Sequence, residues 1–326
     1  MRIVFVTQAA DPAHPVLGAT LAKIRALAER CDEVVVLADQ VDESALPENV
    51  RARSFAAPSQ LQRGARYVAA LAPELADRPV AVVAHMAPIY ALLAAPLTKP
   101  MRVPLLLWFT QQAAGNTLRN AERVVDVVLT VDRRSVPLES HKVRAIGHGI
   151  DISALPCVPE RRPPLRRLLG LGRYAPVKGW ETVIRALDEL PDATLTIHGP
   201  QLTDADREHR LELERIAGDR VVLGDDVPYA QVPQLLGLAD AVVNATHGNS
   251  ADKVVYEAAA ACLPVFAASP VFDTLLPDAL RFTDASSLAA RIRDYTGGAG
   301  RDLRERVEEQ HSVDHWAERL LEAAGA

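Results

Sequence analysis

Short apolar runs rich in Val, Ile and Leu alternate along the chain with longer stretches whose apolar positions recur at helical spacing. In the first half, the apolar runs predict strands at residues 3–7, 33–37, 80–84, 104–109 and 127–131. Helical spacing and an Ala/Leu-rich stretch predict helices near residues 17–30, 60–75, 89–97 and 116–123. Such alternation is typical of a parallel sheet covered by helices on both faces.

The rhythm breaks once, at residues 146–166, where glycines and prolines interrupt the pattern. It then restarts and predicts strands at residues 167–171, 194–198, 221–223, 241–244 and 265–267. Helices are expected between these strands at residues 178–187, 205–217, 230–238 and 252–261, and three more at 286–295, 301–310 and 313–324. We therefore predict an α/β protein of two Rossmann-like, doubly wound domains facing across a cleft, residues 1–150 and 165–305, joined by a linker at 151–164.

Composition and charge agree with two folded domains and narrow the range of partners. The chain has 326 residues, of which 49% are hydrophobic, enough for two α/β cores. Its formal net charge of −6 divides into about +3 for residues 1–150 and about −9 for the remainder. No basic field suited to nucleic acid results, so we expect no nucleic-acid partner.

The N-terminus and the cysteines indicate a cytoplasmic protein. The first residues, MRIVFVTQ, lack the apolar stretch and cleavage site of a signal peptide, and no apolar run approaches the length of a membrane span. The weakly cationic first half leaves peripheral contact with an anionic membrane open. Cys31, Cys157 and Cys262 share no CxxC or metal spacing, so we expect unpaired thiols in a reducing compartment.

The loop after the predicted strand 167–171 has the residue types that a diphosphate requires. Arg173 and Lys178 place two cations five residues apart, just before a predicted helix. An arginine offers a planar fork to phosphate oxygens and a lysine a point charge, while Gly172 lets the backbone turn closely. The alternative is a surface loop that carries two solvated cations.

A second candidate segment, residues 246–257, follows the predicted strand 241–244. Ser250 or Asp252 could cap the next helix, and Glu257 falls four positions after Lys253. A carboxylate there could accept hydrogen bonds from ribose hydroxyls. The alternative is a Lys253–Glu257 pair on a solvated helix face, but the apolar neighbours of Glu257 predict a buried helix, where a carboxylate needs a partner.

The two segments, in this order and at this separation, resemble the donor-binding half of glycosyltransferase family 4, the retaining group with the GT-B fold. The Gly-Arg-x-x-x-x-Lys-Gly loop of that family, which holds the donor diphosphate, corresponds to Gly172, Arg173, Lys178 and Gly179. The glutamate that binds ribose corresponds to Glu257. The resemblance extends to Gly199 and to Asp226 and Val227, whose backbone would border the base, and it places Asn249, Ser250, Asp252 and Lys253 in the donor site.

In the first half, His85, the Trp108-Phe109 pair and residues 147–151 resemble a bacterial branch of the same family, and residues 312–326 resemble its final helix, which packs back on the first domain. Acceptor-side candidates are His14, Gly18, His85 and His148. Each has an alternative: a rigid turn for residues 11–15, a core histidine bonded to a backbone carbonyl for His85, and a linker residue for His148. None of the histidines shows metal-ligand spacing.

The resemblance implies retaining transfer of a sugar from a nucleoside diphosphate sugar of the UDP or GDP type to a hydroxyl acceptor, without an essential metal or cofactor. Two positions depart from the family. Asn249 replaces a glutamate that contacts the transferred sugar, and Gln111 replaces a histidine near the reacting carbon. These departures motivate an alternative, a non-catalytic sugar-nucleotide-binding protein with a regulatory or partner role. An epimerase is a weaker alternative, because it needs acid/base carboxylates and histidines around the sugar.

Overall fold

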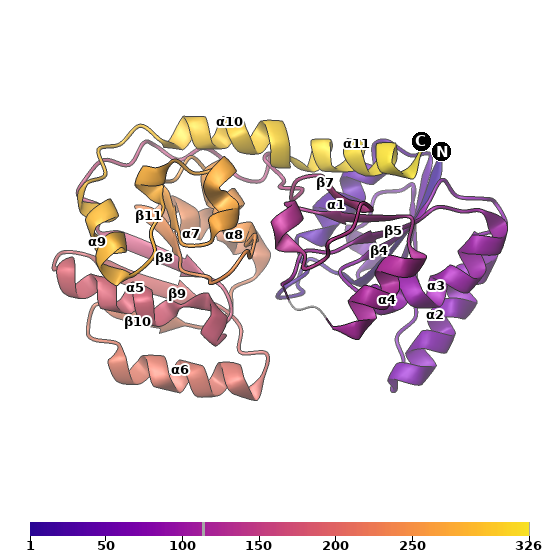
Figure 1. Cartoon of the computed structure of the whole chain (residues 1–326), viewed down its shortest axis with the longest axis horizontal. Helices are drawn as coiled ribbons and strands as arrows, with labels where there is room; N and C mark the ends of the chain where they lie inside the picture. The colour runs from indigo at the N-terminus through magenta and orange to yellow at the C-terminus, as the bar shows by residue number, and fades with distance from the viewer. Residues whose placement is uncertain (113–114, 326) are drawn as a thin grey trace. The chain divides into compact units, whose positions relative to one another are not determined.

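A computed structural model of the chain, which describes residues 1–112 and 115–325, divides into two compact units (Figure 1). Unit 1 comprises residues 1–149 together with 311–326, and unit 2 comprises residues 150–310. Ala326, the last residue of the predicted C-terminal helix, lies outside the described residues.

Unit 1 is built on a parallel sheet of seven strands in the order β3-β2-β1-β4-β5-β6-β7. Strands β4, β5 and β6 are buried along their whole length because helices cover both faces of the sheet. The strands are β1 (Arg2–Ala10), β2 (Glu33–Val41), β3 (Val50–Ser54), β4 (Val82–His85), β5 (Leu105–Trp108), β6 (Val127–Thr130) and β7 (Val143–Ala145).

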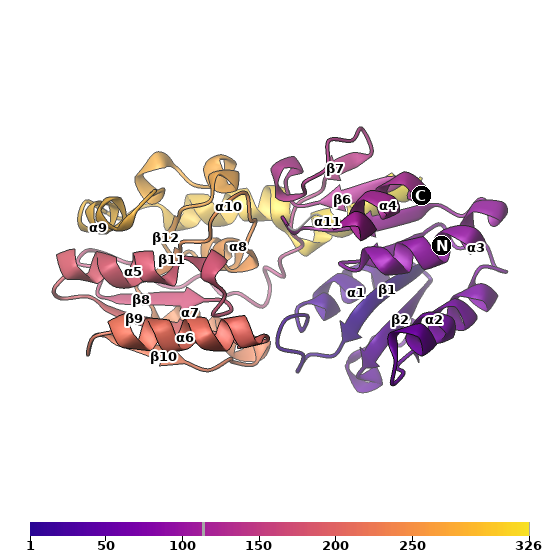
Figure 2. The ribbon, with the colours of Figure 1, turned by 60° about the horizontal axis from the view of Figure 1, so that its bottom comes forward.

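Helices α1 (Thr20–Ala28) and α11 (Val313–Ala324) contact each other on one face of this sheet. The other face carries α2 (Gln60–Glu74), α3 (Pro88–Met101) and α4 (Asn116–Val124), with α2 running alongside β2 (Figure 2). Between these helices and the sheet, the rings of Phe55, Tyr67 and Tyr90 pack with centroids 5.0 to 5.5 Å apart. Burial of such aromatic side chains contributes to the stability of this layer.

The chain leaves unit 1 after Gly149 and re-enters it at His311, and these two residues are hydrogen-bonded to each other. The Gly149 amide donates to the His311 carbonyl at 3.0 Å. Gly149 has a φ of +77°, and a Cβ there would lie 2.9 Å from Cε of Lys23 and 3.0 Å from Cγ of Trp316. Only glycine therefore fits where the two segments meet.

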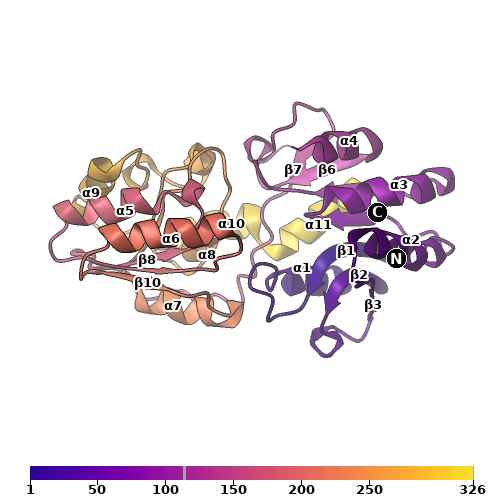
Figure 3. The same ribbon diagram turned by 90° about the horizontal axis from the view of Figure 1, so that it is seen from below.

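Unit 2 contains a parallel sheet of five strands in the order β10-β9-β8-β11-β12. The strands are β8 (Arg167–Leu171), β9 (Thr194–His198), β10 (Val221–Gly224), β11 (Ala241–Asn244) and β12 (Val265–Ala267). Figure 3 shows α5, α6 and α9 on one side of the sheet and α7 on the other. The helices are α5 (Trp180–Ala186), α6 (Asp204–Ile216), α7 (Val232–Leu238), α8 (Lys253–Ala260), α9 (Ala285–Arg293) and α10 (Gly300–His311).

These two sheets confirm the predicted α/β class with two doubly wound, parallel-sheet domains. Two edge strands, β3 and β7, were not predicted. Strand β3 has the sequence VRARS and is only half-buried, and β7 has three residues, so neither shows an apolar run. Among the described residues, no helix is both long and apolar enough to cross a membrane.

The prediction of unpaired thiols is wrong for two of the three cysteines. Cys157 and Cys262 form a disulfide in unit 2, and Cys31 is free and buried. The amide of Val158 donates to the carbonyl of Ala261 at 2.9 Å, which brings the segment after Gly149 beside the end of α8. Because 105 residues separate the two cysteines, their spacing gives no signal of this contact.

The buried carboxylate of Glu74, at the end of α2, pairs with three arginines of the unit 1 sheet. Only 3% of the Glu74 side chain is exposed, and it forms ion pairs with Arg2, Arg51 and Arg53, the last two from strand β3. Hydrogen bonds from Arg51 are the main cause of the lowered pKa of Glu74, against the opposing effect of burial. The network explains why an edge strand carries alternating arginines.

Replacing Glu74 by Gln is expected to lower the free energy of unfolding by about 2 kcal/mol at pH 7, less than for a fully buried pair because Arg51 and Arg53 are nearly half exposed. The folded-state pKa is depressed, so this stabilisation is complete above the unfolded pKa and disappears as the pH falls through the folded pKa. Urea unfolding at pH 7 and pH 3.5 tests both points. Glu29→Gln, at an exposed pair, is the control; equal effects of the two variants would refute the role of Glu74.

Candidate functional site

The predicted donor residues gather at one edge of unit 2. Its strand order reverses direction between β8 and β11, so the loops that follow these two strands start side by side at the carboxyl edge of the sheet. In doubly wound sheets such a switch point opens a crevice for ligands. The loop after β8 carries Arg173 and Lys178, and the loop after β11 leads into α8.

The loop after β8 is held by two buried aromatic side chains. The Trp180 indole nitrogen donates to the Arg173 carbonyl at 3.0 Å, and the Tyr174 hydroxyl donates to the carbonyls of Ile197 and Gly224 at 3.1 and 2.6 Å. The Arg173 guanidinium itself is partly exposed, with 3.7 Å between one of its nitrogens and the buried carboxylate of Asp206. The backbone is therefore fixed while the cation stays accessible.

Glycines permit close backbone contacts around this loop. A Cβ on Gly199, directly after β9, would overlap the carbonyl of Gly172. Gly179 has a φ of +63°, and a Cβ there would lie 2.5 Å from the carbonyl oxygen of Ala245. The three predicted glycines thus lie where the loops after β8, β9 and β11 approach one another.

Lys178 and Asp252 connect the two loops across the switch point. The Lys178 ammonium lies 2.6 Å from Oδ2 of Asp252, and both side chains are largely buried. The same oxygen accepts hydrogen bonds from Asn244 at 2.8 Å and from Thr246, and Oδ1 accepts from Ser250 at 2.9 Å. Burial would raise the pKa of Asp252, but Lys178 and these hydrogen bonds lower it to about 2, so the carboxylate is ionised.

The predicted capping of α8 by Ser250 or Asp252 is wrong. Asp252 occupies the position before the helix, yet its side chain makes no hydrogen bond to the helix amides, because its oxygens are taken by Lys178 and by neighbouring hydroxyl and amide groups. Ser250 donates to Asp252 instead. The first amides of α8 are consequently not covered by either side chain.

Glu257 is buried in α8, with 4% of its side chain exposed, and it forms the pair with Lys253 that its spacing suggested. The pair does not lie on a solvated face. The Lys253 nitrogen is 2.9 Å from Oε1 of Glu257, and the Tyr229 hydroxyl donates to the same oxygen at 2.7 Å. Burial and the adjacent carboxylate raise the pKa of Tyr229, so its phenol remains a donor.

The remaining donor candidates lie in the loops around these groups. Asn249 is half-buried in the loop before α8, and Asp226 and Val227 follow β10, the former exposed and the latter half-buried. No cluster of three or more His, Cys, Asp or Glu that could hold a metal ion occurs in the described part of the chain.

In unit 1, His14 and Gly18 follow β1 and His85 ends β4, the two strands at the switch point of the larger sheet, whereas His148 follows the edge strand β7. Nδ1 of His14 accepts from the amides of Val16 and Leu17, and Gly18 is buried in the same turn. His14 therefore shapes the turn after β1, as the alternative interpretation of residues 11–15 suggested.

His85 is buried at the end of β4 and its Nδ1 lies 3.2 Å from the Thr7 hydroxyl, not from a backbone carbonyl. Burial and the nearby Lys23 lower its pKa well below the usual value, so the imidazole is neutral. His148 is buried between two glycines, and Gln111 is exposed in the loop after β5.

Sequence reasoning missed Lys23, Tyr229 and Asn244, and it assigned no role to Thr246, the first residue of the candidate segment 246–257. Lys23 is buried, with its ammonium 5.8 and 5.4 Å from the ring centroids of Trp108 and Trp316. A lysine among the apolar positions of α1 could have signalled this burial. Nothing local marks Tyr229, because its partner Glu257 lies 28 residues away.

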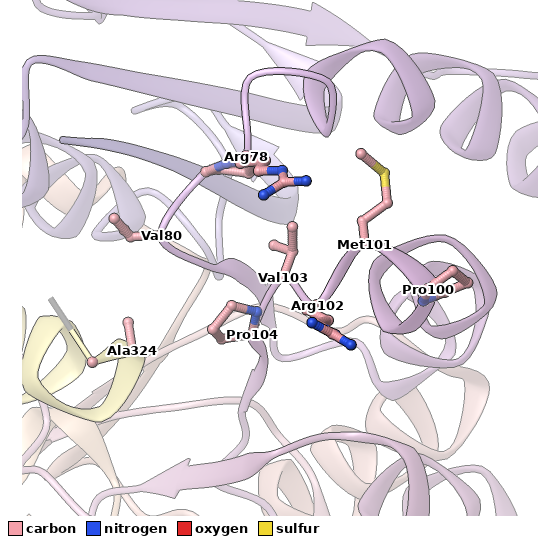
Figure 4. A pocket seen from close by; sticks show the side chains of 10 residues that line it. Arg78, Val80, Pro100, Met101, Arg102, Val103, Pro104 and Ala324 are labelled. Carbon is pink, nitrogen blue, oxygen red and sulfur yellow. The ribbon is translucent and has the colours of Figure 1, made fainter.

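A separate hollow of about 650 Å³ lies at the amino ends of β4 and β5, opposite the edge where ligands bind in such sheets. Figure 4 shows the Arg78 and Arg102 side chains on separate loops that flank Val103. Both arginines are exposed to solvent. The hollow contains none of the predicted site residues.

Replacing Asp252 by Asn is expected to lower the free energy of unfolding by about 2 kcal/mol at pH 7, because Lys178 loses its counter-charge. Since the folded-state pKa is about 2, the difference from wild type should be constant above about pH 5 and shrink as the pH falls toward 2. Chemical unfolding over this pH range measures it, with exposed Asp192→Asn as the control. A difference that does not depend on pH would contradict the assignment.

Comparisons with known proteins agree with this arrangement. Residues 173–322 match the model of a family described as glycosyl transferase-like. The structure is similar to that of HepE from Anabaena, solved with UDP and glucose, with a TM-score of 0.76, 19% identity and coverage of 100% of this chain and 99% of that one. No curated protein matches the chain.

Two further solved structures share the fold. Sucrose-phosphate synthase from Thermosynechococcus elongatus has a TM-score of 0.75 at 18% identity, with 98% of this chain and 97% of that chain covered. A putative UDP-N-acetylglucosamine 2-epimerase from Listeria monocytogenes has a TM-score of 0.62 at 12% identity, with 99% and 95% covered. The chain therefore has the GT-B fold, and the glycosyl transferase-like match to residues 173–322, most of them in unit 2, supports a glycosyltransferase.

Proposed function

We propose that the protein is a retaining glycosyltransferase that moves a sugar from a UDP- or GDP-type sugar to a hydroxyl acceptor. The observation that carries this proposal is the convergence of Arg173, Lys178 and Glu257 at the switch point of unit 2. Two cations on the loop after β8 and a buried carboxylate on the adjoining helix α8 match the chemistry of a diphosphate linked to a ribose. HepE, whose structure is similar, was solved with UDP and glucose.

In the proposed reaction, the bond between the anomeric carbon and the diphosphate breaks while the acceptor oxygen forms a bond on the same face. The acceptor proton passes to the departing diphosphate, so no protein base is required and Gln111 in place of a histidine is compatible with transfer. Negative charge grows on the diphosphate as the bond breaks. Arg173 and Lys178 would stabilise this negative charge. Their side chains would thus supply the positive charge that a bound metal ion supplies in metal-dependent enzymes.

The ion pair with Asp252 determines how Lys178 would act on the diphosphate. Asp252 holds the ammonium at 2.6 Å and prevents it from moving into solvent, so little reorganisation is needed when a diphosphate arrives. Arg173 is the more accessible cation and has a weaker partner in Asp206, at 3.7 Å. Arg173 would therefore turn toward the ligand, and Lys178 would already be in place.

Arg173→Ala and Lys178→Ala are each expected to lower turnover by about 100- to 1,000-fold, because each removes one stabilising group from the departing diphosphate. Turnover is measured as nucleotide release with each accepted donor. Arg185→Ala, which removes an exposed arginine of α5, is the matched control, and melting temperatures recorded in parallel separate loss of fold from loss of chemistry. Full turnover in both site variants would refute their roles.

Gln111 and Asn249 favour one second candidate, a sugar-nucleotide-binding protein without transferase activity. Calorimetric titration with UDP-, GDP- and dTDP-sugars, followed by nucleotide-release assays with candidate hydroxyl acceptors, separates the two. We expect binding and acceptor-dependent release with retention in the product. Binding without release for any acceptor would support the non-catalytic alternative instead.

A further inference from the structure

The carboxylate of Glu257 has an asymmetric environment. Both of its protein partners act on one oxygen: the Tyr229 hydroxyl donates to Oε1 at 2.7 Å, and the Lys253 nitrogen lies 2.9 Å from the same atom. Within the described residues, Oε2 has no hydrogen-bond partner. It is also not among the fully buried polar atoms that lack partners, so it keeps some exposed surface.

The three side chains support one another. The Lys253 ammonium lies 3.8 Å from the centroid of the Tyr229 ring, close enough for a cation–π interaction, and it pairs with Glu257 at the same time. Lys253 and Glu257 are one turn apart on α8, whereas Tyr229 comes from the segment after β10. A contact between two elements thereby fixes the orientation of a carboxylate on one of them.

A purely stabilising arrangement would be expected to satisfy both oxygens of a buried carboxylate, because an unpaired acceptor in the interior is costly. Here two donors share Oε1, and Oε2 is left open. An ionised oxygen with free lone pairs accepts hydrogen bonds from hydroxyl groups. The asymmetry is thus a feature of a binding site more than of a core.

We infer that Tyr229 is a positioning residue: its hydroxyl, with Lys253, fixes Oε1 of Glu257 and so leaves Oε2 to read the 2′-hydroxyl of the donor ribose. The inference rests on the proposed function, since it assumes a nucleoside diphosphate at the switch point. It adds that discrimination between ribose and 2′-deoxyribose depends on a phenol that need not touch the ligand. Tyr229 makes no bond to the Arg173 loop among the described residues, so this effect is separate from the grip on the diphosphate.

The test is calorimetric titration of the full chain with UDP, GDP and their 2′-deoxy counterparts. For wild type, we expect the deoxy form of the preferred base to bind about 10- to 100-fold more weakly, as for loss of a hydrogen bond to a charged group. In Tyr229→Phe, the ribonucleotide should lose affinity while the deoxynucleotide changes little, so that the ratio falls to about 3-fold or less.

Two further variants keep the test decisive. Lys253→Met retains the aliphatic stem but removes the ammonium, and it should lower the ratio in the same direction. Tyr295→Phe removes a phenol hydroxyl elsewhere in unit 2 and should keep the wild-type ratio. If Tyr229→Phe does not fold, Lys253→Met carries the test.

The outcomes separate this inference from the proposed function. If wild type binds none of the four nucleotides, the proposed function fails and the inference falls with it. If wild type binds them and distinguishes ribose from deoxyribose, but Tyr229→Phe and Lys253→Met keep the full ratio, the proposed function stands and the positioning role of Tyr229 is overturned. Equal binding of ribose and deoxyribose forms by wild type would also overturn it.

Discussion

The buried ion pair between Lys178 and Asp252 is the interaction on which the candidate site depends. It joins the loop after β8 to the segment that opens α8, 74 residues later, across the switch point of the unit 2 sheet. Removing a carboxylate from water is costly unless it is paired and hydrogen-bonded. Asp252 meets this condition through four donors: Lys178, Asn244, Thr246 and Ser250.

Other features of the site surround that junction. Because Asp252 is engaged with Lys178, it cannot cap α8, and the first turn of the helix stays uncovered by side chains. One turn further along α8, Glu257 is held by Lys253 and Tyr229 on a single oxygen. Gly179 and Gly199 allow the adjoining loops to approach without side chains between them. Lys178, the start of α8 and the Glu257 carboxylate are thereby set before any ligand binds, which lowers the cost of ordering them on binding.

The fold class was predictable from the sequence because buried parallel strands form apolar runs and the intervening helices show helical spacing. Strand β3 was not predicted because arginines that pair with Glu74 occupy its alternating positions. This polar segment is stabilised by ion pairs and not by burial of apolar side chains. The disulfide and the true role of Asp252 both depend on partners distant in the chain. Local spacing suggested that Asp252 caps a helix. Only the tertiary structure shows that the Asp252 carboxylate is paired with Lys178 instead.

In the candidate site, too, local contacts were predictable from the sequence and contacts between distant segments were not. The Lys253–Glu257 pair was visible as an i, i+4 spacing, and the buried surroundings of Glu257 followed from its apolar neighbours. Tyr229 and Lys23 were not visible, because their importance arises from contacts between elements. The donor, acceptor and catalytic assignments of the sequence remain predictions, with the structure showing where each residue lies and which groups hold it.

Hydrogen–deuterium exchange of the full chain, with and without saturating UDP or GDP, tests most directly whether a nucleoside diphosphate binds at the unit 2 switch point. We expect the nucleotide to slow amide exchange in residues 172–179 and 246–257, the two loops that Lys178 and Asp252 connect. Exchange should be unchanged around the hollow that contains Arg78 and Arg102. Protection at that hollow, with none in the two loops, would contradict the account.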